Sequence, residues 1–100
     1  MERKELEVFS EECNYGIVRM PGRHYPGCVV QGDSLRILLS CAERAEAMAS
    51  RTGIVELIEE IQELKESLED RLLHYGHVLK AHGMDLPYSQ YPAVDSTSIE

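Results

Sequence analysis

Residues 54–82 read IVELIEEIQELKESLEDRLLHYGHVLKAH, and this stretch decides the fold because its apolar residues recur every three or four positions. Such spacing is typical of a helix that packs along one seam. One four-residue insertion near Leu68, a stutter, interrupts the strict heptad. The sequence therefore predicts a long helix over residues 54–82, with acidic residues on its other faces. Its apolar stripe is Ile54, Leu57, Ile61, Leu64, Leu68, Leu72, Tyr75 and Leu79.

A shorter helix is predicted before it. Asp33 or Ser34 is suited to cap its start, because short polar side chains accept a hydrogen bond from the first turn. Residues 51–53 (Arg-Thr-Gly) break it. Its apolar face is wide enough for burial on two sides, since a second row lies beside the first. The first row is Leu35, Leu38, Leu39, Ala42 and Ala49, and the second is Ile37, Cys41, Ala45 and Met48.

Three short strands are predicted before the helices, over residues 5–9, 15–20 and 27–31. Tight turns between them indicate an antiparallel meander, whose apolar face we expect a helix to cover. The fold class is therefore α+β, a small antiparallel three-stranded meander followed by two helices, the second long. We expect one domain over residues 1–88 and a mobile tail over 89–100, with Tyr88 and Tyr91 able to dock back.

The chain is acidic, with 18 acidic against 10 basic residues and a formal net charge of −8. This balance argues against general nucleic-acid binding and against an anionic membrane, but permits a basic protein partner or a small anionic ligand. Three irregularly spaced cysteines do not form a disulfide framework, and no apolar run approaches the roughly 20 residues of a membrane span. We expect a cytoplasmic protein.

The length of the second helix suggests self-association. At 1.5 Å per residue it extends about 40 Å, whereas a compact 100-residue domain has a radius of gyration of about 13 Å. Either the helix bends back, or its stripe packs on the first helix, or its seam packs on another copy. We expect a homo-oligomer that is held together by the N-terminal half of the stripe. The residues concerned are Ile54, Leu57, Ile61, Leu64 and Leu68.

The segment most suited to hold a ligand is residues 19–35, RMPGRHYPGCVVQGDSL. Two Pro-Gly pairs predict turns, because proline presets φ and glycine accepts positive φ. Residues 15–42 contain three arginines against one aspartate, a basic island in an acidic chain. Arginine suits phosphate or carboxylate, and tyrosine can stack on a ring. The candidate ligand-binding residues are Arg19, Arg23, His24, Tyr25, Gln31, Asp33, Ser34 and Arg36.

Structural roles for the same residues remain open. The arginines could pair with the many glutamates of the chain, and Asp33 could do no more than cap its helix. A glycine before a helix start, as at Gly32, exposes backbone N–H groups to an anion, but a capping Asp33 would fill that position itself.

This segment resembles the signature of a family of small, uncharacterised bacterial proteins. They share an Arg-x-Pro-Gly-Arg-x-x-Pro-Gly…Gln-Gly-Asp-Ser/Thr-Leu core followed by two helices, and the resemblance covers roughly residues 1–88. It implies that residues 19–35 are the defining feature and brings no activity with it. The matching positions are Arg19, Arg23, Gln31, Gly32, Asp33 and Ser34.

Catalytic, cofactor and metal sites are not expected. Ser34 with His24 and Asp33, or Cys28 with His24, could form a nucleophile–base arrangement, but Ser34 is at a helix start and Cys28 in a strand. No Cys-x-x-Cys or His-Glu-x-x-His motif supports a metal site. The helical histidines are better interpreted as solvated side chains; they are His74, His77 and His82.

Three functions of different classes follow. The favoured one is a non-enzymatic protein that binds a small anionic, nucleotide-like ligand or signal as a homo-oligomer. The alternative is an acidic protein-interaction module, such as an immunity protein, an antitoxin or a phage-encoded inhibitor. The third is a small enzyme of an unrecognised type that uses residues of the same segment.

Overall fold

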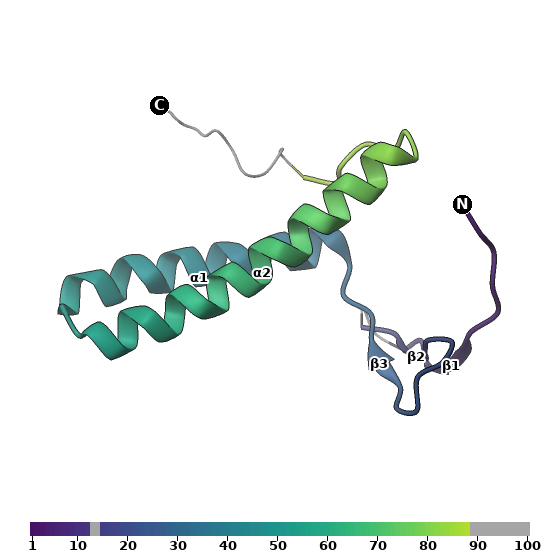
Figure 1. Cartoon of the computed structure of the whole chain (residues 1–100), viewed down its shortest axis with the longest axis horizontal. Coiled ribbons are helices and arrows are strands. Elements are labelled where there is room, and N and C mark those ends of the chain that lie inside the picture. Colours follow the sequence, from purple (N-terminus) through teal and green to yellow (C-terminus); the bar gives the residue numbers. More distant parts are fainter. Residues whose placement is uncertain (13–14, 89–100) are drawn as a thin grey trace. The chain divides into compact units, whose positions relative to one another are not determined.

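The computed structural model describes residues 1–12 and 15–88, and Figure 1 shows its elements. Three strands precede two helices, the second of them the longer, so the predicted α+β class and element order are confirmed. The chain divides into two compact units, Met1–Gln31 and a second that begins at Gly32, and each is described by itself. The elements are β1 (Glu7–Ser10), β2 (Ile17–Arg19), β3 (Gly27–Cys28), α1 (Gly32–Thr52) and α2 (Val55–Ala81).

The first unit is a three-stranded antiparallel sheet in the order β1-β2-β3, which confirms the meander. Val8 pairs with Val18, and the register shifts between Val8 and Ser10. The third strand is shorter than predicted and ends at Cys28, because β2 offers it only two partner residues. Beyond it, the Val29 N–H still donates to the Gly16 carbonyl over 2.7 Å. That a helix covers this sheet stays a prediction.

Helix α1 begins at Gly32, so Asp33 lies inside its first turn rather than before it. The helix ends where predicted. The Thr52 hydroxyl donates to the Ala49 carbonyl over 2.6 Å and accepts the Ile54 N–H over 3.1 Å. Gly53 has φ +71°, which favours glycine, and so turns the chain toward α2.

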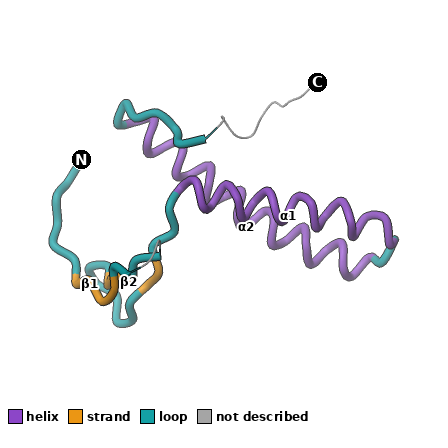
Figure 2. The backbone as a smooth tube through the Cα atoms, turned by 180° about the vertical axis from the view of Figure 1, so that it is seen from behind, coloured by secondary structure: helices purple, strands orange, loops and turns teal. Residues whose placement is uncertain are grey.

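The two helices form an antiparallel hairpin, in which they lie side by side in both Figure 1 and Figure 2. A compact apolar cluster fills the hairpin near the start of α1. Toward the other end, the Lys65 ammonium binds the Glu46 carboxylate at 2.9 Å and so joins α2 to α1. The cluster consists of Leu35, Leu39 and Leu72, with Leu68 and Tyr88 packed against it.

The row of α2 that faces α1 differs from the predicted stripe. Leu57 and Leu64 belong to that stripe but are exposed. The least exposed row instead alternates three- and four-residue steps throughout, so the row that packs on α1 contains no stutter. The predicted stripe follows an exposed apolar row up to Leu68 and the inward row after it. The two rows share Ile61 and Leu68, and joining them at Leu68 produces the four-residue insertion. The inward row is Ile58, Ile61, Lys65, Leu68, Leu72, Tyr75 and Leu79.

The segment after α2 turns back along the helix. Leu86 lies near Gly76, and the ring of Tyr88 stacks on that of Tyr75 with centroids 6.4 Å apart. The predicted docking of Tyr88 is therefore confirmed. The corresponding prediction for Tyr91, and that of a mobile tail, concern residues 89–100, which lie outside the described residues.

Candidate functional site

The link between β2 and β3 starts with the turn that the first Pro-Gly pair predicts. The Arg23 N–H donates to the Met20 carbonyl over 3.1 Å, and Gly22 has φ +81°. With Pro21 before the glycine, this is a type II turn, which needs positive φ at its third residue. The second Pro-Gly pair forms no such turn, because Gly27 is extended within β3.

Arg19 is held inside the sheet unit by three groups. Its Nε lies 2.6 Å from the Glu7 carboxylate, which stands opposite on β1. Its guanidinium sits 5.3 Å from the ring centroid of Phe9, a cation–π contact. Its Nη1 donates to the His24 carbonyl. Arg19 therefore ties the segment around His24 to β1 and β2.

The residues between the two Pro-Gly pairs, Arg23, His24 and Tyr25, form what we call the β2–β3 tip. All three are exposed, and Tyr25 is 79% exposed. The rings of His24 and Tyr25 meet edge to face with centroids 4.7 Å apart. Within the described chain, the Arg23 guanidinium has no carboxylate partner. The tip thus presents a cation and two aromatic rings to solvent.

Gln31 is placed away from Arg19. It lines a shallow hollow on the face of the sheet that carries Val8 and Val18. Successive strand residues point to opposite faces, so Arg19 projects from the other side. The hollow is lined by both apolar and polar side chains. It is lined by Val8, Ser10, Glu11, Gly16, Val18, Val29 and Gln31.

Gly32 is packed beneath an aromatic ring. A Cβ atom added there would lie 2.2 Å from Cζ of Tyr75 and 2.4 Å from its hydroxyl oxygen. The ring therefore covers the glycine that the sequence suggested as a backbone anion site. Asp33 accepts the Ser34 N–H over 2.9 Å within its own helix turn. Tyr75 is a neighbour of this segment that sequence reasoning missed, because forty-odd residues separate the two positions along the chain.

Arg36 also has partners on its own helix. Its Nη1 donates to the Ser40 hydroxyl over 2.9 Å and lies 3.6 Å from the Glu43 carboxylate. Burial raises the pKa of the nearby Tyr88 phenol, Tyr75 adds to the rise, and the Arg36 charge lowers it. Two of the three candidate arginines, Arg19 and Arg36, thus pair with glutamates, as the structural alternative foresaw.

The groups considered for catalysis or metal binding come from both units of the chain. Within residues 1–12 and 15–88, His, Cys, Asp and Glu side chains form no group of three that could hold a metal ion. Cys28 and Cys41 are exposed free thiols. Ser34 lies in α1, in the second unit, whereas His24 and Cys28 lie in the first.

Comparison with known proteins gives a family but no activity. None of the helices in the described part of the chain has the length and apolar character that crossing a membrane requires. No curated protein and no solved structure gives a significant match. A family model matches residues 1–88. Because that match takes in the strands, the β2–β3 tip and both helices, the chain belongs to DUF6959, a family of unknown function.

Proposed function

We propose that this chain is a non-enzymatic cytoplasmic binding protein that holds a small anionic, nucleotide-like ligand at the β2–β3 tip, as part of a homo-oligomer. One observation carries the proposal: Arg23 stands exposed on a fixed turn, without a carboxylate partner in the described chain, beside two exposed aromatic rings. The exposed free thiols of Cys28 and Cys41 support a reducing compartment.

The chemistry of the tip suits such a ligand. A guanidinium offers a planar fork of N–H donors that matches phosphate or carboxylate oxygens. The Tyr25 ring, with little else covering it, can stack on a base. The type II turn and the Arg19–His24 hydrogen bond fix the segment before binding, which lowers the entropy cost of holding a ligand.

The other candidate residues take smaller parts in the proposal. Arg19 is a positioning residue, because its guanidinium already binds Glu7 and the His24 carbonyl. Gln31 could offer an amide from the hollow of the sheet. Asp33, Ser34 and Arg36 have partners within α1, and we assign them no direct ligand contact here.

Isothermal titration with a panel of mono-, di- and cyclic nucleotides tests the proposal. Losing charge-assisted hydrogen bonds costs about 1.5–3 kcal/mol, so we expect Arg23→Ala to weaken binding by roughly ten- to a hundredfold. Arg3→Ala removes the same charge from an exposed residue outside the tip and serves as the matched control. A panel without any binding, or equal affinity in Arg23→Ala and the parent, contradicts the proposal.

A second candidate function is an acidic protein-interaction module, such as an immunity protein, an antitoxin or a phage-encoded inhibitor. The observation that favours it is the row of exposed glutamates along α2, which could oppose a basic cleft. A pull-down from host lysate should then return a partner that Glu59→Lys/Glu66→Lys fails to retain. The exposed glutamates of α2 include Glu56, Glu59, Glu60, Glu63 and Glu66.

A further inference from the structure

The helical hairpin carries two long faces of different character. At about 100° per residue, Leu38, Cys41, Ala45 and Met48 lie within one arc of α1, to one side of its buried row. Leu57, Ile61 and Leu64 lie within a similar arc of α2, beside the row that faces α1. Because the helices are antiparallel and both right-handed, the two arcs open on the same side of the hairpin. We call these seven residues the apolar face.

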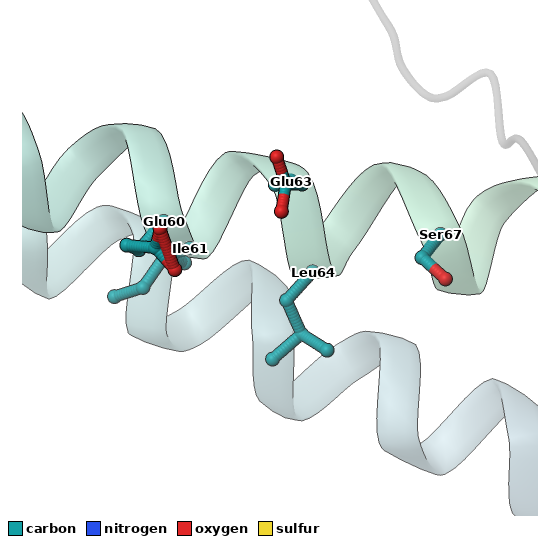
Figure 3. A pocket seen from close by; sticks show the side chains of 5 residues that line it. All are labelled: Glu60, Ile61, Glu63, Leu64 and Ser67. Carbon is teal, nitrogen blue, oxygen red and sulfur yellow. The ribbon is translucent and has the colours of Figure 1, made fainter.

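The opposite side of the hairpin carries polar side chains. There Arg36 pairs with Glu43 along α1, whereas Glu46 and Lys65 join the two helices between their facing rows. On the apolar face, by contrast, the side chain of Met48 is 58% exposed and that of Leu64 is 55% exposed. Figure 3 shows Ile61 and Leu64 in a shallow hollow of this face, with Glu60 and Glu63 beside them and Ser67 beyond. An exposed apolar surface of this kind is suited to contact with another protein surface.

The two outer edges of the apolar face carry opposite charges. Arg44 and Arg51 lie on the outer edge of α1, whereas Glu56, Glu60 and Glu63 lie on the outer edge of α2, all of them exposed.

The packing of α1 on α2 determines the height of each of these charged residues along the helix axes. Leu35 and Leu39 of α1 form one cluster with Leu68 and Leu72 of α2. Extending this antiparallel register along the two helices at 1.5 Å per residue places Arg44 level with Glu63, and Arg51 level with Glu56. The basic edge and the acidic edge therefore have matching charge spacings.

We propose that the apolar face binds a second copy of this chain, with α1 of each copy lying against α2 of the other around a twofold axis parallel to the helices, in an antiparallel four-helix bundle. This arrangement brings Arg44 and Arg51 of one copy to the level of Glu63 and Glu56 of the other, twice by symmetry. The alternative, α1 against α1, would set like charges on each edge against each other.

The hollow around Leu64 fits this arrangement. In the bundle, the hollow between Ile61 and Leu64 of one copy faces the small and flexible side chains of Cys41, Ala45 and Met48 of the other. The assembly deepens the homo-oligomer part of the proposed function and is independent of whether the β2–β3 tip binds a ligand.

The apolar contact is tested on the full chain by sedimentation equilibrium, with circular dichroism to follow helix content. Leu64→Glu places a charge in the interface and should weaken dimerisation by about a hundredfold or more. Leu73→Glu is the matched control, because Leu73 is an exposed leucine of α2 that lies off the apolar face. It should leave the dimer intact at equal helix content.

The pairing of α1 with α2 is tested by charge reversal. Arg44→Glu/Arg51→Glu should weaken the dimer by roughly tenfold, since it turns paired charges into like charges. Adding Glu56→Arg/Glu63→Arg to the same chain should restore the parent dissociation constant. Arg3→Glu/Lys4→Glu makes the same change in net charge away from the helices and should have little effect.

Three results would overturn the inference. A chain that remains monomeric at millimolar concentration removes the assembly altogether. A dimer that Leu64→Glu leaves unchanged rejects this face. A dimer that Leu64→Glu dissociates, but that Arg44→Glu/Arg51→Glu affects no more than the control, rejects the α1-against-α2 pairing. None of these results bears on nucleotide binding at Arg23, so failure of the assembly and failure of the ligand proposal are distinguishable.

Discussion

Gly32 matters to the hairpin because the Tyr75 ring occupies the space that any side chain at this position would need. Its role is spatial, since the residue starts α1 while the ring comes from the far part of α2. Tyr88 stacks on the same ring and so extends the packing toward the end of the described chain. A glycine that appeared suited to an anion is thus a packing residue.

We predict that Gly32→Ala destabilises the protein. The new methyl group would meet the Tyr75 ring at 2.2 Å, so the ring must move and its packing is lost, at a cost of about 1–3 kcal/mol in the free energy of unfolding. Urea denaturation measures this change.

Gly76→Ala is the control for that experiment. Its nearest atom outside the helix backbone, Leu86 Cδ2, is 3.8 Å from the added Cβ, and alanine favours the helix interior by up to about 1 kcal/mol over glycine. Gly76→Ala should therefore leave stability equal or higher. Equal stability of Gly32→Ala and the parent would show that Tyr75 does not occupy this position in solution.

At the scale of the elements, the helices are joined by an apolar cluster at one end and by an ion pair farther along. Lys65 takes a position in the inward row of α2 that a leucine would usually fill, and Glu46 of α1 meets it at 2.9 Å. The hydrogen bond to Glu46 raises the pKa of Lys65 above its ordinary value of 10.5, against the opposing effect of burial. Both side chains are 24% exposed, so solvent screens the pair only in part.

The raised pKa of Lys65 predicts how the stability of the protein changes with pH. The folded state favours the charged Lys65, so its contribution to stability is fully present below pH 10.5 and is lost as pH rises through the higher folded pKa. A double-mutant cycle of Lys65→Met and Glu46→Gln should give a coupling energy of up to about 1 kcal/mol at neutral pH that fades at alkaline pH. Unfolding in urea at stepwise higher pH measures it.

The control for this cycle is Lys80→Met combined with Glu46→Gln. Lys80 is an exposed lysine near the end of α2, with no ion pair to Glu46. It should show no coupling at any pH. Coupling between Lys65 and Glu46 that persists unchanged far above the lysine pKa would mean that packing, and not charge, joins the two side chains.

At the scale of the whole molecule, the sheet and the hairpin are separate compact units. Every buried apolar side chain of the described chain belongs to the hairpin, whereas the side chains of the first unit are exposed or intermediate. The two units also differ in charge. The β2–β3 tip is basic, whereas α2 carries many of the exposed carboxylates of the chain.

We therefore predict that a fragment of residues 32–88 retains the helical structure of the intact chain. It contains the whole Leu35, Leu39 and Leu72 cluster together with Tyr88, so the interactions that join α1 to α2 stay complete. Circular dichroism should show helix and a cooperative thermal transition. A fragment of residues 32–82, which lacks Tyr88, is the comparison and should melt at lower temperature. A non-helical 32–88 fragment would show that the hairpin depends on the first unit.

The sequence by itself determined the element order, the break at residues 51–53 and the Pro21–Gly22 turn. These features depend on local rules: helical periodicity, proline and glycine dihedrals, and capping, all of which act within a few residues. The candidate tip was also predicted from local rules, because its basic residues and the Pro-Gly pairs on either side of it can be read directly from the sequence.

Tertiary structure decided the rest, because the deciding partners are distant along the chain. Two apolar rows on α2 compete in the sequence, and only the packing of α1 shows that the row through Lys65 is inward. Arg19 meets Glu7 because β1 and β2 pair in one register. Tyr75 covers Gly32 because the hairpin is antiparallel. Each contact requires two segments to come together, which no local pattern specifies.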